Sequence, residues 1–332
     1  MRAVVLEAYG PPESLRLTEL PDPAVRRPGD VRVAIEAAAI NPVDWKIRSG
    51  LERGLIRLTL PAVLGFDFTG TVIEAGSAVR DLQVGDPVLG NAPVLGPGAY
   101  AEQVVVDARS VVRRPEGLTP IAAAGLPLAG LTAWQCLVPF IEGTPGAQVF
   151  VQAGGGGVGH LAIQLAKRYG AFVATTASDR TRSLVTDLGA DRVIDYQSED
   201  WWDVVAGYDV VLESLGGVHR EHALRAVRRG GRVASINSDV TTNTRRYGAL
   251  GGLVATGVTI ASFAARGRLR GVDAASVVRR IDSTQLSTMA AWVADGSLRV
   301  AIDRTLPLEA LAEAHRYGET GRIQGKVVIT MA

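Results

Sequence analysis

A glycine-rich turn between an apolar segment and an amphipathic segment is the feature of this sequence with the most specific chemistry. The spacing of its glycines fits G-x-G-x-x-G, and it follows a predicted strand over 148–153 and opens a predicted helix over 158–169. Such a turn lets backbone approach a pyrophosphate, and the helix N-terminus offers free N–H groups and partial positive charge. The turn therefore predicts a bound nicotinamide dinucleotide, held by Gly154, Gly156, Gly157, Val158 and Gly159.

The residues that follow the second predicted strand favour NADPH over NADH. Enzymes that use NAD usually place an acid at the end of this strand, where it binds the ribose hydroxyls. Here the strand over 172–177 ends in small hydroxyl residues and continues into Ser178, Asp179, Arg180 and Arg182. Hydroxyl and guanidinium donors suit the additional 2′-phosphate. Asp179 comes after the strand and beside the arginines, so we expect NADP(H) as the cofactor.

Composition and charge narrow the possible partners. The chain has 332 residues, 47% of them hydrophobic, with a formal net charge of +1. A balanced charge gives no reason to expect binding to nucleic acid or to an anionic membrane. Cys136 is the only cysteine, so no internal disulfide can form. The uncharged segment 121–141 contains glycines and prolines and is interpreted as buried helices. We expect a cytoplasmic protein.

Two successive patterns of predicted secondary structure indicate an α/β protein with two domains. The first 120 residues contain short strands separated by Gly and Pro, which is typical of a compact β-barrel. From Ala122 onward strands alternate with helices, which predicts a doubly wound parallel sheet of the Rossmann type. The segment 258–263 is predicted to be its sixth strand, and 239–257 a mobile loop that could contain a short helix. The expected domains are 1–121 with 269–332 and, inserted between them, 122–268.

Several further motifs give the sequence its family resemblance. These are Asn41 to Gly50, Pro61 to Gly70, Val84-Gly85-Asp86, Gly98 to Glu102, Leu131 to Trp134, Leu188 to Asp191 and Gly325 to Val328. Together with the glycine turn, in this order, they resemble the quinone oxidoreductase-like (zeta-crystallin-like) branch of the medium-chain dehydrogenase/reductase superfamily. The resemblance covers essentially the whole chain, and it implies that the barrel is a GroES-like catalytic domain.

The resemblance also implies positions for individual residues around the cofactor. Asn41 and Thr132 would lie beside the nicotinamide, and Ser178, Arg180 and Tyr196 around the adenosine 2′-phosphate. The acid of NAD-dependent relatives would fall at Thr176, which again favours NADPH. The nicotinamide ribose would contact Leu215, Ser235, Ile236, Asn237 and Lys326.

The ligands of a catalytic zinc are missing from the matching positions. Zinc-dependent members of the superfamily hold the metal with Cys, His and Cys, and the first two would fall at Asn41 and Phe66. Neither an amide nor a phenyl group replaces them, so we expect no metal. Without a Lewis acid, the substrate must itself be electron-poor, such as a quinone or an α,β-unsaturated carbonyl compound.

The proton donor and the biological role stay open at this level. For an enone, Lys46, Tyr100 or Tyr247 could supply a proton, and Lys46 is selected with Asn41 as the catalytic pair. The main expectation is a zinc-independent NADPH-dependent quinone or enone reductase. The first alternative is a non-redox cyclase or tailoring enzyme of secondary metabolism, and the lesser one a structural or RNA-binding protein. A homodimer is expected through pairing of the segment 258–263, since exposed strand edges are usually paired.

Overall fold

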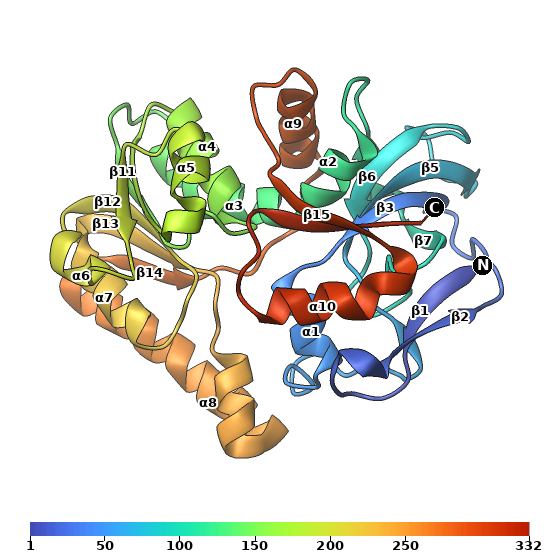
Figure 1. Cartoon of the computed structure of the whole chain (residues 1–332), viewed down its shortest axis with the longest axis horizontal. Helices are drawn as coiled ribbons and strands as arrows, with labels where there is room; N and C mark the ends of the chain where they lie inside the picture. The colour runs from blue at the N-terminus through green and yellow to red at the C-terminus, as the bar shows by residue number, and fades with distance from the viewer. Residues whose placement is uncertain (332) are drawn as a thin grey trace. The chain divides into compact units, whose positions relative to one another are not determined.

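The computed structural model describes residues 1–331, which divide into two compact units (Figure 1). Unit 1 comprises Met1–Leu131 together with the described part of Arg280–Ala332, and unit 2 comprises Thr132–Arg279. Both boundaries lie later in the chain than predicted. The first is shifted because Ala124 packs with Ala37 and Val328 in the core of unit 1. The second is shifted because the last strand of the unit 2 sheet follows residue 268.

Unit 1 is a β-structure built around a closed hydrophobic core. Its longest sheet has the order β15-β16-β3-β5-β6-β8 with β7 paired to β3, and a smaller sheet has the order β2-β1-β4. Burial alternates along β3, as expected for a strand with one face in the core. The short strands predicted in the first 120 residues are confirmed. The elements are β1 (Arg2–Leu6), β2 (Leu15–Glu19), β3 (Asp30–Ala39), α1 (Pro42–Arg48), β4 (Ala62–Val63), β5 (Asp67–Ala75), β6 (Pro87–Asn91), β7 (Gln103–Asp107), β8 (Val111–Arg113), α2 (Pro120–Gly125), α9 (Ser283–Ala294), β15 (Ile302–Pro307), α10 (Leu311–Glu319) and β16 (Lys326–Thr330).

Unit 2 is the predicted doubly wound sheet. Six parallel strands run in the order β11-β10-β9-β12-β13-β14, which is the strand order of the Rossmann fold. Helices α4 and α5 pack on β9 to β11, and α7 packs on β12 and β13. The elements are α3 (Pro127–Ile141), which enters from unit 1, β9 (Gln148–Val151), α4 (Gly159–Arg168), β10 (Phe172–Ala177), α5 (Asp179–Asp187), β11 (Arg192–Asp195), α6 (Trp201–Val204), β12 (Tyr208–Glu213), α7 (Val218–Ala226), β13 (Val227–Ser235), α8 (Val240–Arg270) and β14 (Asp273–Ser276).

The prediction for the segment between β13 and β14 is wrong. Both the expected loop 239–257 and the expected strand 258–263 belong to α8, which has one kink at Gly248. The β-branched and aromatic residues of 258–263 suggest a strand, but Thr256, Phe263 and Gly267 are buried at helical spacing against the sheet. The sixth strand is β14, which follows the left-handed Gly271 at the end of the helix. The reason given for a dimer through strand 258–263 is therefore lost.

Candidate functional site

The glycine turn joins the end of β9 to the start of α4 at the point where the strand order of unit 2 reverses, between β9 and β12. In open parallel sheets this is where ligands bind. A Cβ atom on Gly154 would lie 2.1 Å from the Thr175 hydroxyl, and one on Gly159 would lie 2.3 Å from the Ala153 carbonyl oxygen. Both positions therefore require glycine, because the side chain of Thr175 on β10 fills the space beside Gly154 and the backbone of the turn fills the space beside Gly159.

The turn leaves backbone donors available for an anion. Within residues 1–331, the amide groups of Gly155, Gly157 and Val158 donate to no acceptor. These groups lie at or just before the N-terminus of α4, whose first turn carries no acidic side chain. Free N–H groups together with the positive end of the helix dipole favour a phosphate. The residues predicted to hold the pyrophosphate therefore fit that group.

The residues predicted around the adenosine phosphate gather at the carboxyl ends of β10 and β11. Tyr196 follows β11 directly and donates its backbone N–H to the carbonyl of Ala177 at 3.4 Å. Ser178 caps α5, and Arg180 and Arg182 are exposed in the first turn of that helix. The four predicted side chains thus come from one edge of the sheet.

Thr176 has a different role from the acid that it replaces in NAD-dependent relatives. Its side chain is buried, and its hydroxyl accepts a hydrogen bond of 2.8 Å from the N–H of Ala153 in the glycine turn. This bond fixes the turn against β10. Asp179 is the nearest acid in sequence, but it lies outside the strand with a highly exposed side chain, 3.8 Å from Arg182.

The residues predicted at the nicotinamide ribose follow β12 and β13, the next two strands of the same sheet edge. Leu215 comes two residues after β12, whereas Ser235 ends β13 and leads into Ile236 and Asn237. Ser235 is buried and donates its hydroxyl to Glu213 at 2.5 Å. Its side chain therefore holds the loop, and contact between Ser235 and the ribose stays a prediction.

Sequence reasoning missed the charged residues that shape this part of the site. Glu213 is fully buried and accepts the N–H groups of Leu215, at 2.7 Å, and of Gly216. The buried Arg220 pairs with Asp239 at 3.0 Å, and Asp239 in turn accepts the N–H of Gly217, also at 3.0 Å. An acid that ends the apolar run of β12 was the available sequence signal. These paired buried charges hold two loops in fixed positions at the sheet edge.

Unit 1 contains a buried polar cluster formed by Asn41, Asp67 and Lys326. Lys326 is 2% exposed, and its ammonium donates to Asn41 Oδ1 at 2.5 Å, to the carbonyl of Ile40 at 3.2 Å and to Asp67 Oδ2 at 3.3 Å. Asn41 in turn donates through Nδ2 to Asp67 at 3.0 Å. Lys326, which is predicted to contact the ribose, and Asn41, which is predicted to contact the nicotinamide, are therefore hydrogen-bonded to each other.

The donor chemistry of this cluster does not fit a catalytic zinc. Asn41 and Phe66 occupy the positions of two metal ligands, and the amide oxygen of Asn41 already accepts from an ammonium group. Phe66 is part of the hydrophobic core of unit 1. Among residues 1–331, no three His, Cys, Asp or Glu side chains come together in a way that could hold a metal ion.

Three buried titratable groups, Asp44, Tyr100 and His315, lie in unit 1. Asp44 accepts the backbone N–H of Asn41 at 2.6 Å, and burial raises the pKa of its carboxyl to about 7. His315 packs edge-on against Tyr100 at 5.7 Å, and burial, together with the charge of Arg48, lowers its pKa to about 3. Tyr100 is fully buried, and burial with the neighbouring Asp44 raises its pKa well above the usual value. Tyr100 is therefore a packing residue that keeps its proton.

The remaining predicted residues occupy less constrained positions. Lys46 is half-buried on α1, five residues after Asn41 caps that helix, and Thr132 is buried in α3. Nothing in the geometry of Lys46 distinguishes it as a proton donor, so that role stays a prediction.

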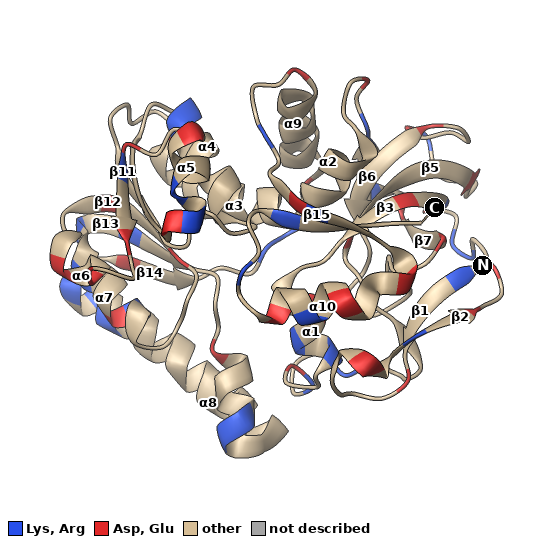
Figure 2. Ribbon diagram, in the orientation of Figure 1, with Lys and Arg blue, Asp and Glu red and all other residues tan. Residues whose placement is uncertain are grey.

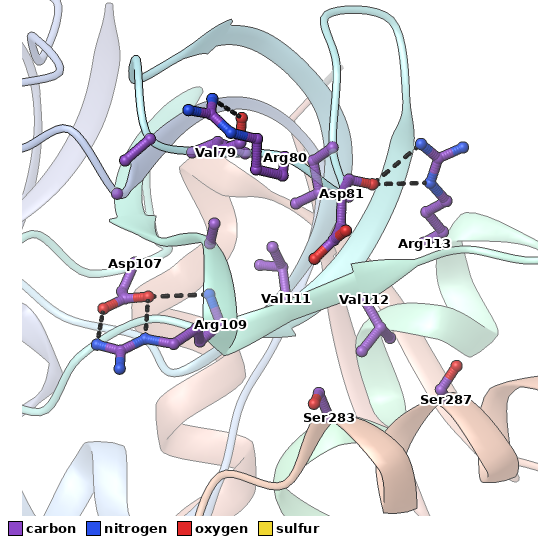
Figure 3. A pocket seen from close by; sticks show the side chains of 14 residues that line it. Val79, Arg80, Asp81, Asp107, Arg109, Val111, Val112, Arg113, Ser283 and Ser287 are labelled. Atoms are coloured by element: carbon purple, nitrogen blue, oxygen red, sulfur yellow. Dashed lines mark hydrogen bonds and ion pairs between the residues drawn. The ribbon is translucent and has the colours of Figure 1, made fainter.

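A cavity of about 670 Å³ in unit 1 is lined by none of the predicted site residues. Figure 3 shows its side chains, which come from the segment 78–82, from 107–113 and from α9. Arg109 is paired with Asp107 at 2.6 Å, and Arg113 donates to the carbonyl of Asp81 at 3.0 Å. Because its cations are committed to neighbouring oxygens, the cavity offers no strong anion site.

Comparison with known proteins gives matches along the whole chain. Residues 27–116 match the family model of the alcohol dehydrogenase GroES-like domain, and residues 188–329 match that of the zinc-binding dehydrogenases. The chain is 31% identical to the mitochondrial NAD(P)H oxidoreductase RTN4IP1 of Mus musculus, over 100% of this chain and 89% of that protein. It is 34% identical to a chloroplastic NADPH-dependent alkenal/one oxidoreductase of Arabidopsis thaliana, over 99% of this chain and 79% of that protein.

A solved structure shows the same fold. The quinone oxidoreductase of Coxiella burnetii superimposes with a TM-score of 0.88 at 32% identity, covering 100% of this chain and 99% of the other. The predicted combination of a GroES-like domain with a Rossmann-type sheet is thereby confirmed.

Proposed function

Since the chain belongs to the medium-chain dehydrogenase/reductase superfamily, in its zinc-independent quinone oxidoreductase-like branch, we propose that it is an NADPH-dependent reductase of quinones or α,β-unsaturated carbonyl compounds. Its class is oxidoreductase and its cofactor is NADP(H). The observation that carries the finer assignment is the sheet edge after β10, where Thr176 is buried and Arg180 and Arg182 are exposed.

NADPH, when bound, supplies the hydride. The free amides of the turn 154–159 would bind the pyrophosphate, and the arginines of α5 the 2′-phosphate. The loops held by Glu213 and Arg220 would fix the ribose end. One hydride and one proton convert a quinone to a hydroquinone, or an enone to the saturated carbonyl compound. Asn41 and Phe66 stand where two zinc ligands would fall, so we expect the acceptor to be electrophilic in its own right.

Steady-state kinetics with both cofactors tests the proposal. We expect NADPH oxidation with a 1,4-quinone or a 2-alkenal, at a rate that EDTA leaves unchanged. Replacing both Arg180 and Arg182 with alanine should raise the KM for NADPH at least about tenfold, because each charge-assisted hydrogen bond contributes about 1.5–3 kcal/mol. The KM for NADH should stay nearly constant. The matched control is Arg109→Ala, which removes an exposed arginine of unit 1.

Two results would contradict the proposal. One is turnover of a simple alcohol that depends on added metal. The other is an equal loss of NADPH and NADH binding in the double arginine variant, which would show that these side chains do not distinguish the 2′-phosphate.

A further inference from the structure

Helix α8 carries an apolar surface that the fold leaves uncovered. Residues 247–265 contain no charged side chain. The helix is long and apolar enough to cross a membrane by length and composition, with a mean hydropathy of 1.6 over its most apolar window. A buried core helix would explain such a composition, but only 17% of that window is buried. The apolar residues therefore face outward in this chain.

The exposed residues form one continuous stripe. Leu250, Val254 and Val258 follow one another at intervals of four residues, which places them on one side of the helix after the kink at Gly248. Tyr247 precedes this kink and lines the same groove as these three side chains. Leu250 is 78% exposed, Val254 63% and Val258 60%. A single exposed leucine needs no explanation, but a stripe of large apolar side chains marks an interaction surface.

The opposite face of α8 is anchored in unit 2. Phe263 belongs to the core that covers the sheet, and a Cβ on Gly267 would lie 2.5 Å from the Cβ of Ala274 in β14. Before the kink at Gly248, the first arm of the helix folds back on the second, and Asn243 donates to Thr256 at 3.1 Å. A helix that is held at its end and along its first arm cannot cross a bilayer without leaving the sheet. It can only lie along a surface.

Positive charge borders the stripe at both ends. Arg245 and Arg246 precede it, and Arg268 follows it, whereas Arg266 and Arg270 pair with Glu221. Figure 2 shows the body of α8 as uncharged, with basic residues on its lower arm. Within residues 1–331, the guanidinium groups of Arg245, Arg246 and Arg268 have no acidic partner.

This charge pattern selects the occupant of the surface. Parallel packing of two copies would bring like arginines together, which is costly at an interface. A layer of anionic headgroups above an apolar interior matches both features, with Tyr247 at the boundary between them.

We propose that the stripe on α8, formed by Tyr247, Leu250, Val254 and Val258 with Arg245 and Arg246, binds the surface of a membrane that contains anionic phospholipids. The helix lies in the plane of the interface, with its apolar side chains in the headgroup–acyl boundary. The net charge of +1 does not exclude this, because it averages over the whole surface, whereas basic and exposed apolar side chains lie together on α8.

Flotation of the full-length protein with lipid vesicles tests the proposal. The protein should float with vesicles of phosphatidylcholine and phosphatidylglycerol and stay at the bottom with phosphatidylcholine alone. Leu250→Gln combined with Val254→Gln should reduce the vesicle-bound fraction about tenfold or more, since both side chains lose their transfer from water. Arg245→Gln combined with Arg246→Gln should weaken binding several-fold and reduce its dependence on salt.

Matched controls keep the outcome interpretable. Leu17→Gln combined with Val84→Gln replaces two exposed apolar residues of unit 1 and should bind vesicles like the unmodified protein. Circular dichroism establishes that each variant is folded. Absence of flotation with anionic vesicles would overturn the proposal. A dimer in light scattering that the α8 substitutions convert to a monomer would assign the stripe to a second copy instead, and would also overturn it. The outcome is independent of the proposed reductase activity.

Discussion

Replacing Asp44 with asparagine should change how the stability of the protein depends on pH. Asp44 is fully buried beside Asn41, and its carboxyl has a pKa of about 7 in the folded chain against 3.8 as a reference for the unfolded chain. The folded protein therefore holds a proton that the unfolded chain releases between these two values. Across this window, the contribution of Asp44 to the free energy of unfolding falls as pH rises.

The magnitude follows from the size of the shift. One pKa unit corresponds to about 1.4 kcal/mol, so a shift of roughly three units corresponds to about 4 kcal/mol. Asparagine keeps an oxygen that can accept the N–H of Asn41, but it does not titrate. Relative to the unmodified protein, Asp44→Asn should gain about 1.4 kcal/mol per pH unit between about pH 4 and pH 7, and nothing further above that range.

Urea unfolding between about pH 4 and pH 8, followed by circular dichroism and tryptophan fluorescence, measures this difference. Asp107→Asn is the matched control, because its partner Arg109 lowers the pKa of Asp107 to about 2, below the measured window. That variant should differ from the unmodified protein by a constant amount. The reasoning is refuted if the difference between Asp44→Asn and the unmodified protein does not change with pH, since a buried carboxylate would then be ionised at no cost.

Three further predictions address the other buried groups and the turn. His315→Phe should gain stability relative to the unmodified protein as pH falls below about 6.5. The reason is that His315, with a pKa of about 3 in the folded protein, stays neutral there, whereas in the unfolded chain it takes up a proton. Urea unfolding at several pH values measures this gain, and a difference that does not change with pH would contradict the prediction. Lys326→Met should lower the free energy of unfolding by about 3–5 kcal/mol, because it leaves Asp67 buried without its cation. In a double-mutant cycle, adding Asp67→Asn should restore much of the lost free energy of unfolding. Strictly additive effects of the two substitutions would contradict the pairing. Gly159→Ala should abolish NADPH binding in fluorescence titration and destabilise the protein by about 1–3 kcal/mol, because its Cβ would collide with the Ala153 carbonyl. The control Gly257→Ala, whose Cβ meets no atom within 4 Å, should leave stability unchanged or raise it. Equal behaviour of the two variants would contradict this packing of the turn.

Local sequence patterns determined the strand, glycine turn and helix at the start of the cofactor domain. The glycine spacing, the strand before it and the helix after it are encoded within about twenty residues, so periodicity and turn chemistry suffice to place them. The sequence at the end of β10 likewise predicted that Ser178 and Arg180 lie at the edge of the sheet. These inferences hold because each depends on backbone geometry that neighbouring residues impose.

Contacts between distant segments could not be predicted from the sequence. Lys326 and Asn41 are 285 positions apart, and nothing local indicates that the ammonium of one binds the amide of the other. The roles of Glu213 and Arg220 depend in the same way on loops that only the folded sheet brings together.

Helix α8 shows the same division most clearly. Its apolar composition was visible in the sequence, but the β-branched segment 258–263 suggested an edge strand of the sheet. Only the tertiary structure decided that this segment is helical, with Phe263 buried against the sheet and Val258 exposed. The physical reason is that a short apolar run satisfies both periodicities, and packing against the rest of the molecule selects between them.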